Sequence, residues 1–117
     1  MYQPTALLVE DEPLIALDLQ LELEVGGYRV IAAADAEEAQ QLCGEYAFDL
    51  VILNYFYKNS PDGLALAQKL GLGADTKLLF VTGSHIMELP PQPSVQSPYR
   101  VLHKPFTRRQ LRSVLLP

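Results

Sequence analysis

Residues 49–54 read DLVILN, an unbroken run of four apolar residues between an aspartate and an asparagine. Such a run, bounded by polar residues, is typical of a short strand that is buried on both faces. Strands of this kind occur mainly in parallel sheets, where helices cover both sides. The stretch therefore predicts a strand inside the parallel sheet of an α/β domain.

Further strands and helices alternate along the rest of the chain. We expect strands at residues 5–9, 28–33, 77–82 and 99–103, and helices at residues 14–25, 36–46, 64–70 and after Thr107. Crossover helices between parallel strands must pack back on the sheet, so this alternation favours a doubly wound sheet with helices on both faces. The chain has 117 residues, the length of one domain, and we predict a single five-stranded α/β domain over residues 1–117.

Two of the expected helices begin with a capping signature. Asp35 is followed three residues later by Glu38, and Thr107 is followed three residues later by Gln110. In a capping box the first side chain accepts a hydrogen bond from the backbone three residues on, and the second side chain reaches back. We therefore place the starts of two helices directly after Asp35 and Thr107.

One connection departs from the alternation of strands and helices. Residues 88–98 read ELPPQPSVQSP and contain four prolines. Proline removes a backbone donor and disfavours helical geometry in the residue before it, so this stretch cannot form a regular helix. We predict a proline-rich loop in place of the fourth helix of the fold.

Composition narrows the class of protein. The net charge is -5 and the few basic residues form no patch with aromatic residues, which argues against nucleic-acid binding. No apolar run approaches the roughly 18 residues that span a bilayer, and the start MYQPT carries no secretory signal, so we expect a cytoplasmic protein. Cys43 stands alone and cannot form an internal disulfide, and we interpret Arg108-Arg109 as a solvated helix start.

Polar residues stand where the predicted strands end. Glu10-Asp11 follow the first strand, Asn54 the third, Thr82 ends the fourth and Lys104 follows the fifth. In an open parallel sheet the working groups gather outside the carboxyl ends of the strands. Carboxylates beside a hydroxyl and an ammonium group suit a hard divalent cation and a phosphoryl group.

These motifs resemble the signature of the receiver domains of bacterial two-component response regulators. The matching stretches are VEDE at 9–12, LVIL at 50–53, VTG at 81–83 and KPF at 104–106, and they cover essentially the whole chain. The resemblance implies a CheY-like, flavodoxin-like fold, a role in phosphorelay signalling rather than catalysis, a sensor histidine kinase or another signalling protein as partner, and a cis Lys104-Pro105 bond. It also implies the site positions: magnesium at Glu10, Asp11, Asn54 and Phe56, the phospho-acceptor position at Asn54, the switch hydroxyl at Thr82 and the phosphoryl-binding lysine at Lys104.

The acceptor position holds an asparagine where the family keeps an aspartate. A neutral amide cannot attack a phosphohistidine as a carboxylate does, so the chain as written is not phosphorylated there. Loss of one negative charge also weakens the expected binding of magnesium. Asn54 is either natural or an engineered replacement of an aspartate, and the sequence leaves both open.

Aromatic positions also differ from the family pattern. Val101 stands where many receivers place a rotating aromatic residue, so the usual coupling to Thr82 is absent or rebuilt with Tyr99. The run Tyr55, Phe56 and Tyr57 has two interpretations, packing over the site or recognition of a partner.

The first helix carries two apolar stripes that cannot both face one core. By alignment with the family, Ile15, Leu19 and Leu23 face the sheet. This leaves a second stripe partly outside, made of Leu14, Leu17, Leu21 and Val25. An exposed stripe of this size is commonly a binding surface, and we expect a symmetric homodimer through this helix, together with the last helix.

Three classes of function stay open at this point. The first is a receiver that works by protein contact. The second is a small flavodoxin-like enzyme or nucleotide binder, which lacks the glycine-rich loop after the first strand because Glu10-Asp11-Glu12 stand there. The third is an adaptor domain whose pocket is vestigial.

Overall fold

Five parallel strands form one sheet in the order β2-β1-β3-β4-β5. The structure is a computed structural model that describes residues 2–55, 62–83 and 99–115. The strands are β1 (Thr5–Val9), β2 (Arg29–Ala33), β3 (Leu50–Asn54), β4 (Lys77–Thr82) and β5 (Tyr99–His103). This strand order is the doubly wound, flavodoxin-like order that the sequence predicts.

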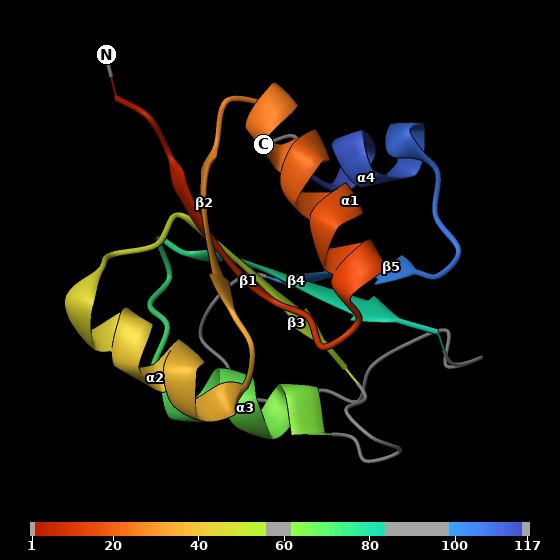
Figure 1. Cartoon of the computed structure of the whole chain (residues 1–117). Coiled ribbons are helices and arrows are strands. Elements are labelled where there is room, and N and C mark those ends of the chain that lie inside the picture. Colours follow the sequence, from red (N-terminus) through yellow and green to blue (C-terminus); the bar gives the residue numbers. More distant parts are fainter. Residues whose placement is uncertain (1, 56–61, 84–98, 116–117) are drawn as a thin grey trace.

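Helices cover both faces of the sheet (Figure 1). They are α1 (Pro13–Val25), α2 (Ala36–Glu45), α3 (Asp62–Leu70) and α4 (Arg108–Leu115). α1 and α4 lie over one face, and α2 and α3 lie over the other (Figure 1). The proline-rich stretch at 88–98 and the helix that it was expected to replace lie outside the described residues. Among the described residues, no helix has the length and apolar character that crossing a membrane requires.

The core consists of two layers, one on each face of the sheet, and β3 contributes to both. All five residues of β3 are buried, as the apolar run predicts. Val51 and Leu53 join the cluster under α2 and α3. Leu50 and Ile52 join the cluster under α1 and α4. Successive side chains of a strand point to opposite faces, so one short strand supplies both layers.

Both predicted helix caps are confirmed. The Asp35 carboxylate accepts a hydrogen bond of 2.8 Å from the backbone N–H of Glu38. The backbone N–H of Thr107 donates to Oε1 of Gln110 at 2.8 Å, and the backbone N–H of Gln110 donates to Oγ1 of Thr107 at 3.1 Å. The second pair is a complete capping box, which fixes where α4 begins.

A buried carboxylate joins α1 to α4. Glu22 lies on the buried side of α1, with Oε1 2.8 Å from Nε of Arg108 and Oε2 3.4 Å from Nη2 of Arg112. Arg108 is exposed at the start of α4, as expected for a solvated helix start, and in addition its guanidinium group contacts Glu22. A carboxylate shielded from water is costly unless cations and donors compensate it, and here α4 supplies both.

The two apolar stripes of α1 separate as the sequence predicts. Leu19 and Leu23 are fully buried against the sheet, and Ile15 packs beside them. The second stripe faces outward, with exposed fractions of 83% for Leu14, 52% for Leu17, 52% for Leu21 and 74% for Val25. We call these four residues the α1 stripe.

Gly63 brings the start of α3 against the end of β3. Its N–H donates to the carbonyl of Tyr55 at 2.9 Å. A Cβ added to Gly63 would overlap the backbone carbonyl oxygen of Asn54 and lie 2.7 Å from Cα of Tyr55. The close approach of α3 to the end of β3 therefore requires glycine.

Gly63→Ala is expected to lower the free energy of unfolding by about 1–3 kcal/mol, because backbone atoms must move to admit the methyl group. Gly44→Ala is the matched control, since Gly44 is also helical but a Cβ there meets nothing within 4 Å. The control is expected to raise stability by about 0.5–1 kcal/mol. Urea denaturation measures both changes, and equal effects of the two substitutions would contradict the close contact.

Candidate functional site

The strand register brings the predicted site residues to one edge of the sheet. Val9 of β1 is paired with Leu53 of β3, so Glu10 follows Val9 where Asn54 follows Leu53. Asn54 is paired with Val81 of β4, directly before Thr82. Parallel pairing thus places the ends of β1, β3 and β4 in one row, as expected for a doubly wound sheet.

Asn54 is the centre of this group. Its side chain is buried, and Nδ2 donates to Oδ1 of Asp11 at 3.2 Å. The amide also hydrogen-bonds the carboxylate of Glu10. One neutral donor group therefore bridges two neighbouring acids at the end of β1, a role that a carboxylate at this position could not take.

Lys104 supplies the positive charge of the site. Its Nζ lies 3.6 Å from Oε2 of Glu10 and 3.7 Å from Oε1 of Glu12. The backbone N–H of Lys104 donates to the carbonyl of Thr82 at 2.8 Å, which ties the lysine to the end of β4. The Lys104-Pro105 peptide bond is cis, as the resemblance implies.

Glu12 was missed as a member of the site. It was quoted only as part of the acidic run 10–12, and its position directly before Pro13 suggested a helix start. The structure brings its exposed carboxylate to the same ammonium group that contacts Glu10. The signal that could have found it is the pairing of three successive acids with a single lysine.

Glu10 is a buried carboxylate with opposing influences on its pKa. Removal from water raises the pKa, because burial disfavours the charged form. The hydrogen bonds from Asn54 and from the backbone N–H of Glu12, at 3.2 Å, lower the pKa, and so does the charge of Lys104. Burial is the largest influence, and the net pKa is raised above the ordinary value of 4.5.

Thr82 lies at the same edge, at the end of β4. Its side chain is buried. The next residue, Gly83, lies beside the Lys104 side chain, since an added Cβ would stand 3.9 Å from both Cβ and Cδ of Lys104. The hydroxyl, the amide and the ammonium group therefore belong to one strand-end cluster.

The oxygen atoms of this cluster suit magnesium only in part. Glu10 and Asp11 offer carboxylate oxygens, which are the ligands that magnesium prefers. Both carboxylates are already engaged by Asn54, and Glu10 also by Lys104. Within residues 2–55, 62–83 and 99–115, no three or more His, Cys, Asp or Glu side chains are grouped so that they could hold a metal ion. Phe56, a further expected magnesium position, lies outside the described residues.

Three aromatic residues form a row that runs from the buried residue after β3 to the exposed start of β5. Tyr55 is buried, and its ring meets Phe80 edge-on with 5.9 Å between centroids. Phe80 in turn meets Tyr99 at 5.8 Å. Tyr55 therefore packs inside the domain, whereas Phe56 and Tyr57 lie outside the described residues. Tyr99 begins β5, at the opposite end of that strand from Lys104, so it does not stand beside Thr82.

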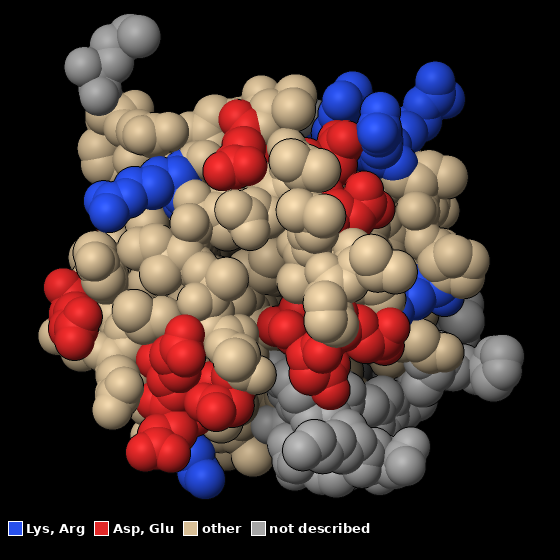
Figure 2. Space-filling view, in the orientation of Figure 1, with Lys and Arg blue, Asp and Glu red and all other residues tan. Residues whose placement is uncertain are grey.

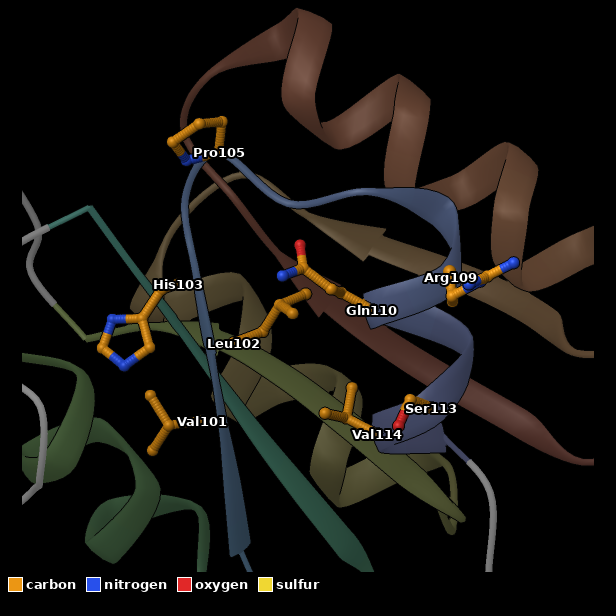
Figure 3. A pocket seen from close by; sticks show the side chains of 8 residues that line it. All are labelled: Val101, Leu102, His103, Pro105, Arg109, Gln110, Ser113 and Val114. Atoms are coloured by element: carbon orange, nitrogen blue, oxygen red, sulfur yellow. The ribbon is translucent and has the colours of Figure 1, made fainter.

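A hollow of about 470 Å³ lies beside this cluster, between β5 and α4 (Figure 3). Leu102, Pro105 and Val114 give it apolar walls, and Arg109 and Gln110 from α4 border it. Glu10, Asp11 and Asn54 do not line it. The hollow is therefore separate from the strand-end cluster.

Comparison with known proteins points to the same family that the sequence motifs resemble. The family model described as response regulator receiver domain matches residues 6–116. The response regulator receiver protein CpdR of Brucella abortus is 30% identical over 106 residues, which are 90% of this chain and 88% of that protein. The aerobic respiration control protein ArcA of Escherichia coli K12 is 39% identical over 85 residues, 71% of this chain, and the matched region spans only about a third (34%) of that relative's length.

Solved structures agree with the fold. A CheY-like receiver domain from Methylobacillus flagellatus superposes with a TM-score of 0.79 at 23% identity and covers 97% of both chains. The receiver domain of the hybrid histidine kinase CckA superposes with a TM-score of 0.74 at 26% identity and covers 95% of this chain and 94% of that one.

The raised pKa of Glu10 leads to a pH-dependent stability. Between 4.5 and the raised pKa the folded state binds more protons than the unfolded state, so the free energy of unfolding falls as the pH rises through that window. Glu10→Gln is expected to flatten this decline. Urea denaturation from pH 4.5 up to neutral measures it, with Glu37→Gln on the exposed start of α2 as control. An unchanged decline in Glu10→Gln would contradict the assignment.

Asn54→Asp is expected to lower the free energy of unfolding by about 1–3 kcal/mol in chelator, because a third carboxylate replaces the donor that bridges Asp11 and Glu10. Magnesium should then stabilise this variant more than the Asn54 chain, since the ion binds the folded form. Asn54→Ala is the control, because it removes the donor without adding charge and should gain no magnesium response. Equal magnesium effects in all three chains would contradict the account.

Proposed function

Because the chain belongs to the response regulator receiver domain family, we propose that it is a receiver module of two-component signalling that works through protein contact. As written, with Asn54 at the acceptor position, it is not phosphorylated. It is a signalling module and not an enzyme, and its place is the cytoplasm.

The observation that carries this proposal is the engagement of Asn54. An acyl phosphate forms when a carboxylate oxygen attacks a phosphoryl group, and an amide offers no such nucleophile. The Nδ2 of Asn54 is directed at Asp11 and Glu10 instead. The residue thus serves the internal hydrogen bonding of the pocket rather than phosphoryl transfer.

Magnesium is a possible but weakened cofactor in this proposal. Glu10, Asp11 and Asn54 are the described residues that would hold it, with Phe56 as a further expected position. When bound, the ion would neutralise charge on phosphoryl oxygens. Lys104 already balances Glu10 and Glu12, so the pocket has less need of a second cation.

Protein contact is the remaining way for such a module to act. A sensor histidine kinase or another signalling protein is the proposed heterologous partner, and a second copy of the chain is the proposed partner of the α1 stripe. The α1 stripe supports this role, because large apolar side chains in a contiguous exposed row commonly mark an interaction surface. Nucleic acid is not a proposed partner, given the net charge of -5.

A second candidate is a phospho-accepting receiver whose natural residue at position 54 is aspartate. The observation in its favour is that Lys104, Thr82 and the two acids all stand in one cluster around Asn54. These are the groups that phosphoryl binding needs. An adaptor domain with a vestigial pocket is the third possibility, and it requires none of them to bind anything.

Incubation with acetyl phosphate and magnesium tests these possibilities. Asn54→Asp is expected to gain the mass of one phosphoryl group, and the Asn54 chain is expected to gain none. Lys104→Ala added to Asn54→Asp should slow the gain, because the ammonium group that stabilises the phosphoryl oxygens is lost.

Intact-mass spectrometry reads the outcome. A gain at position 54 of the Asn54 chain would contradict the proposal that Asn54 blocks phosphorylation. No gain in either chain would remove the phosphoryl-binding pocket and leave the vestigial adaptor.

A further inference from the structure

Glu12 connects the strand-end cluster to the start of α1. Its backbone N–H donates to Oε1 of Glu10 at 3.2 Å, and its backbone carbonyl accepts from the N–H of Ala16 in the first turn of α1 at 2.9 Å. Its carboxylate lies 3.7 Å from Nζ of Lys104. The backbone of Glu12 is therefore fixed on both sides, and its side chain reaches across the cluster to the lysine.

Lys104 is shared by two acids that differ in exposure. The side chain of Glu10 is 1% exposed, and that of Glu12 is 63% exposed. Release of Glu10 from the lysine would leave a buried carboxylate without its cation, which is costly. Release of Glu12 returns a carboxylate to water, and an exposed ion pair of this kind adds little to stability. Glu12 is therefore the acid that an incoming anion can displace from the lysine.

The surface around the strand-end cluster carries an excess of negative charge. Acidic side chains gather on the surface just before α1 begins (Figures 1 and 2). Glu10, Asp11 and Glu12 follow one another there, and Lys104 is the ammonium group that contacts the first and the last of them. A phosphoryl group that enters the cluster adds a further anion around this ammonium group, so it must compete with an acid already in place.

We propose that Glu12 is a positioning residue that withholds Lys104 from a phosphoryl group and is displaced when one binds. This inference rests on the second candidate function, in which position 54 is an aspartate that accepts phosphoryl. In that reaction a carboxylate oxygen at position 54 attacks phosphorus, the bond from phosphorus to the donor oxygen breaks, and the donor leaves with the electron pair. Lys104 transfers no proton in this step and stabilises the phosphoryl oxygens, so its ion pair with Glu12 slows the step.

The rate of phosphoryl uptake from acetyl phosphate at saturating magnesium tests the role of Glu12. All chains carry Asn54→Asp, and intact-mass spectrometry follows the uptake. Glu12→Gln keeps the size of the side chain and removes its charge, so it should raise the rate by about two- to fivefold, as expected for loss of one exposed ion pair. Glu24→Gln is the matched control, because Glu24 is an exposed acid near the other end of α1, and it should leave the rate unchanged.

A double-mutant cycle separates competition for Lys104 from general repulsion of an anionic donor. If Glu12 acts through Lys104, Glu12→Gln should no longer raise the rate once Lys104→Ala is also present. General repulsion predicts the same gain with and without the lysine. If Lys104→Ala abolishes uptake altogether, phosphoramidate replaces acetyl phosphate as the donor in the chains that keep the lysine. Phosphoramidate carries less negative charge, so competition for Lys104 predicts an undiminished gain and general repulsion predicts a smaller one.

The inference would be overturned by the absence of a gain from Glu12→Gln, by an equal gain without Lys104, or by a smaller gain with phosphoramidate. The phosphoryl-binding pocket is judged separately, by whether Asn54→Asp takes up phosphoryl at all. Uptake by Asn54→Asp without an effect of Glu12→Gln rejects the role of Glu12 and keeps the pocket. If none of these chains takes up phosphoryl, the pocket is rejected, and the role of Glu12 is rejected with it.

Discussion

The amide of Asn54 is the interaction on which the site depends. Glu10 is buried and Asp11 stands beside it, and two acids held together at a sheet edge repel each other unless donors or cations intervene. Asn54 bonds both carboxylates, and Lys104 reaches Glu10 and Glu12. The pocket is thus balanced by the chain's own groups, whereas a third carboxylate at position 54 would demand another cation.

The sheet makes this arrangement possible. β3 is buried along its whole length, and its register with β1 and β4 sets which residues emerge together at the edge. Gly63 lets α3 approach the end of the same strand through backbone contact. Asn54 is therefore buried between the neighbouring strands and the start of α3, where the core is densely packed. On the opposite face, Glu22 fixes α4 beside α1 and so shapes the surface that carries the α1 stripe.

Most of the fold and of the candidate site could be predicted from the apolar runs and from the polar residues that follow them. A run such as residues 50–53 specifies a buried strand, and parallel strands place their carboxyl ends together, so Asp11, Asn54 and Lys104 were expected to converge. The contact of Glu22 with Arg108 was not predictable, because apolar periodicity says which side of a helix is buried but not which distant polar group meets it. The role of Tyr55 was left open between packing and partner recognition for a related reason, since the sequence does not show that the chain stays packed one residue past the strand. The capping box at Thr107 was predictable because it is local.

Hydrogen exchange of the Asn54 side-chain amide, followed by NMR, tests the central claim most directly. If Nδ2 is buried and bonded to the two acids, its protons should exchange far more slowly than those of the exposed amide of Gln41 on α2. Asp11→Ala should speed the exchange at Asn54 and leave Gln41 unchanged. Exchange at Asn54 as fast as at Gln41 in the native chain would contradict the claim that this amide holds the acids together.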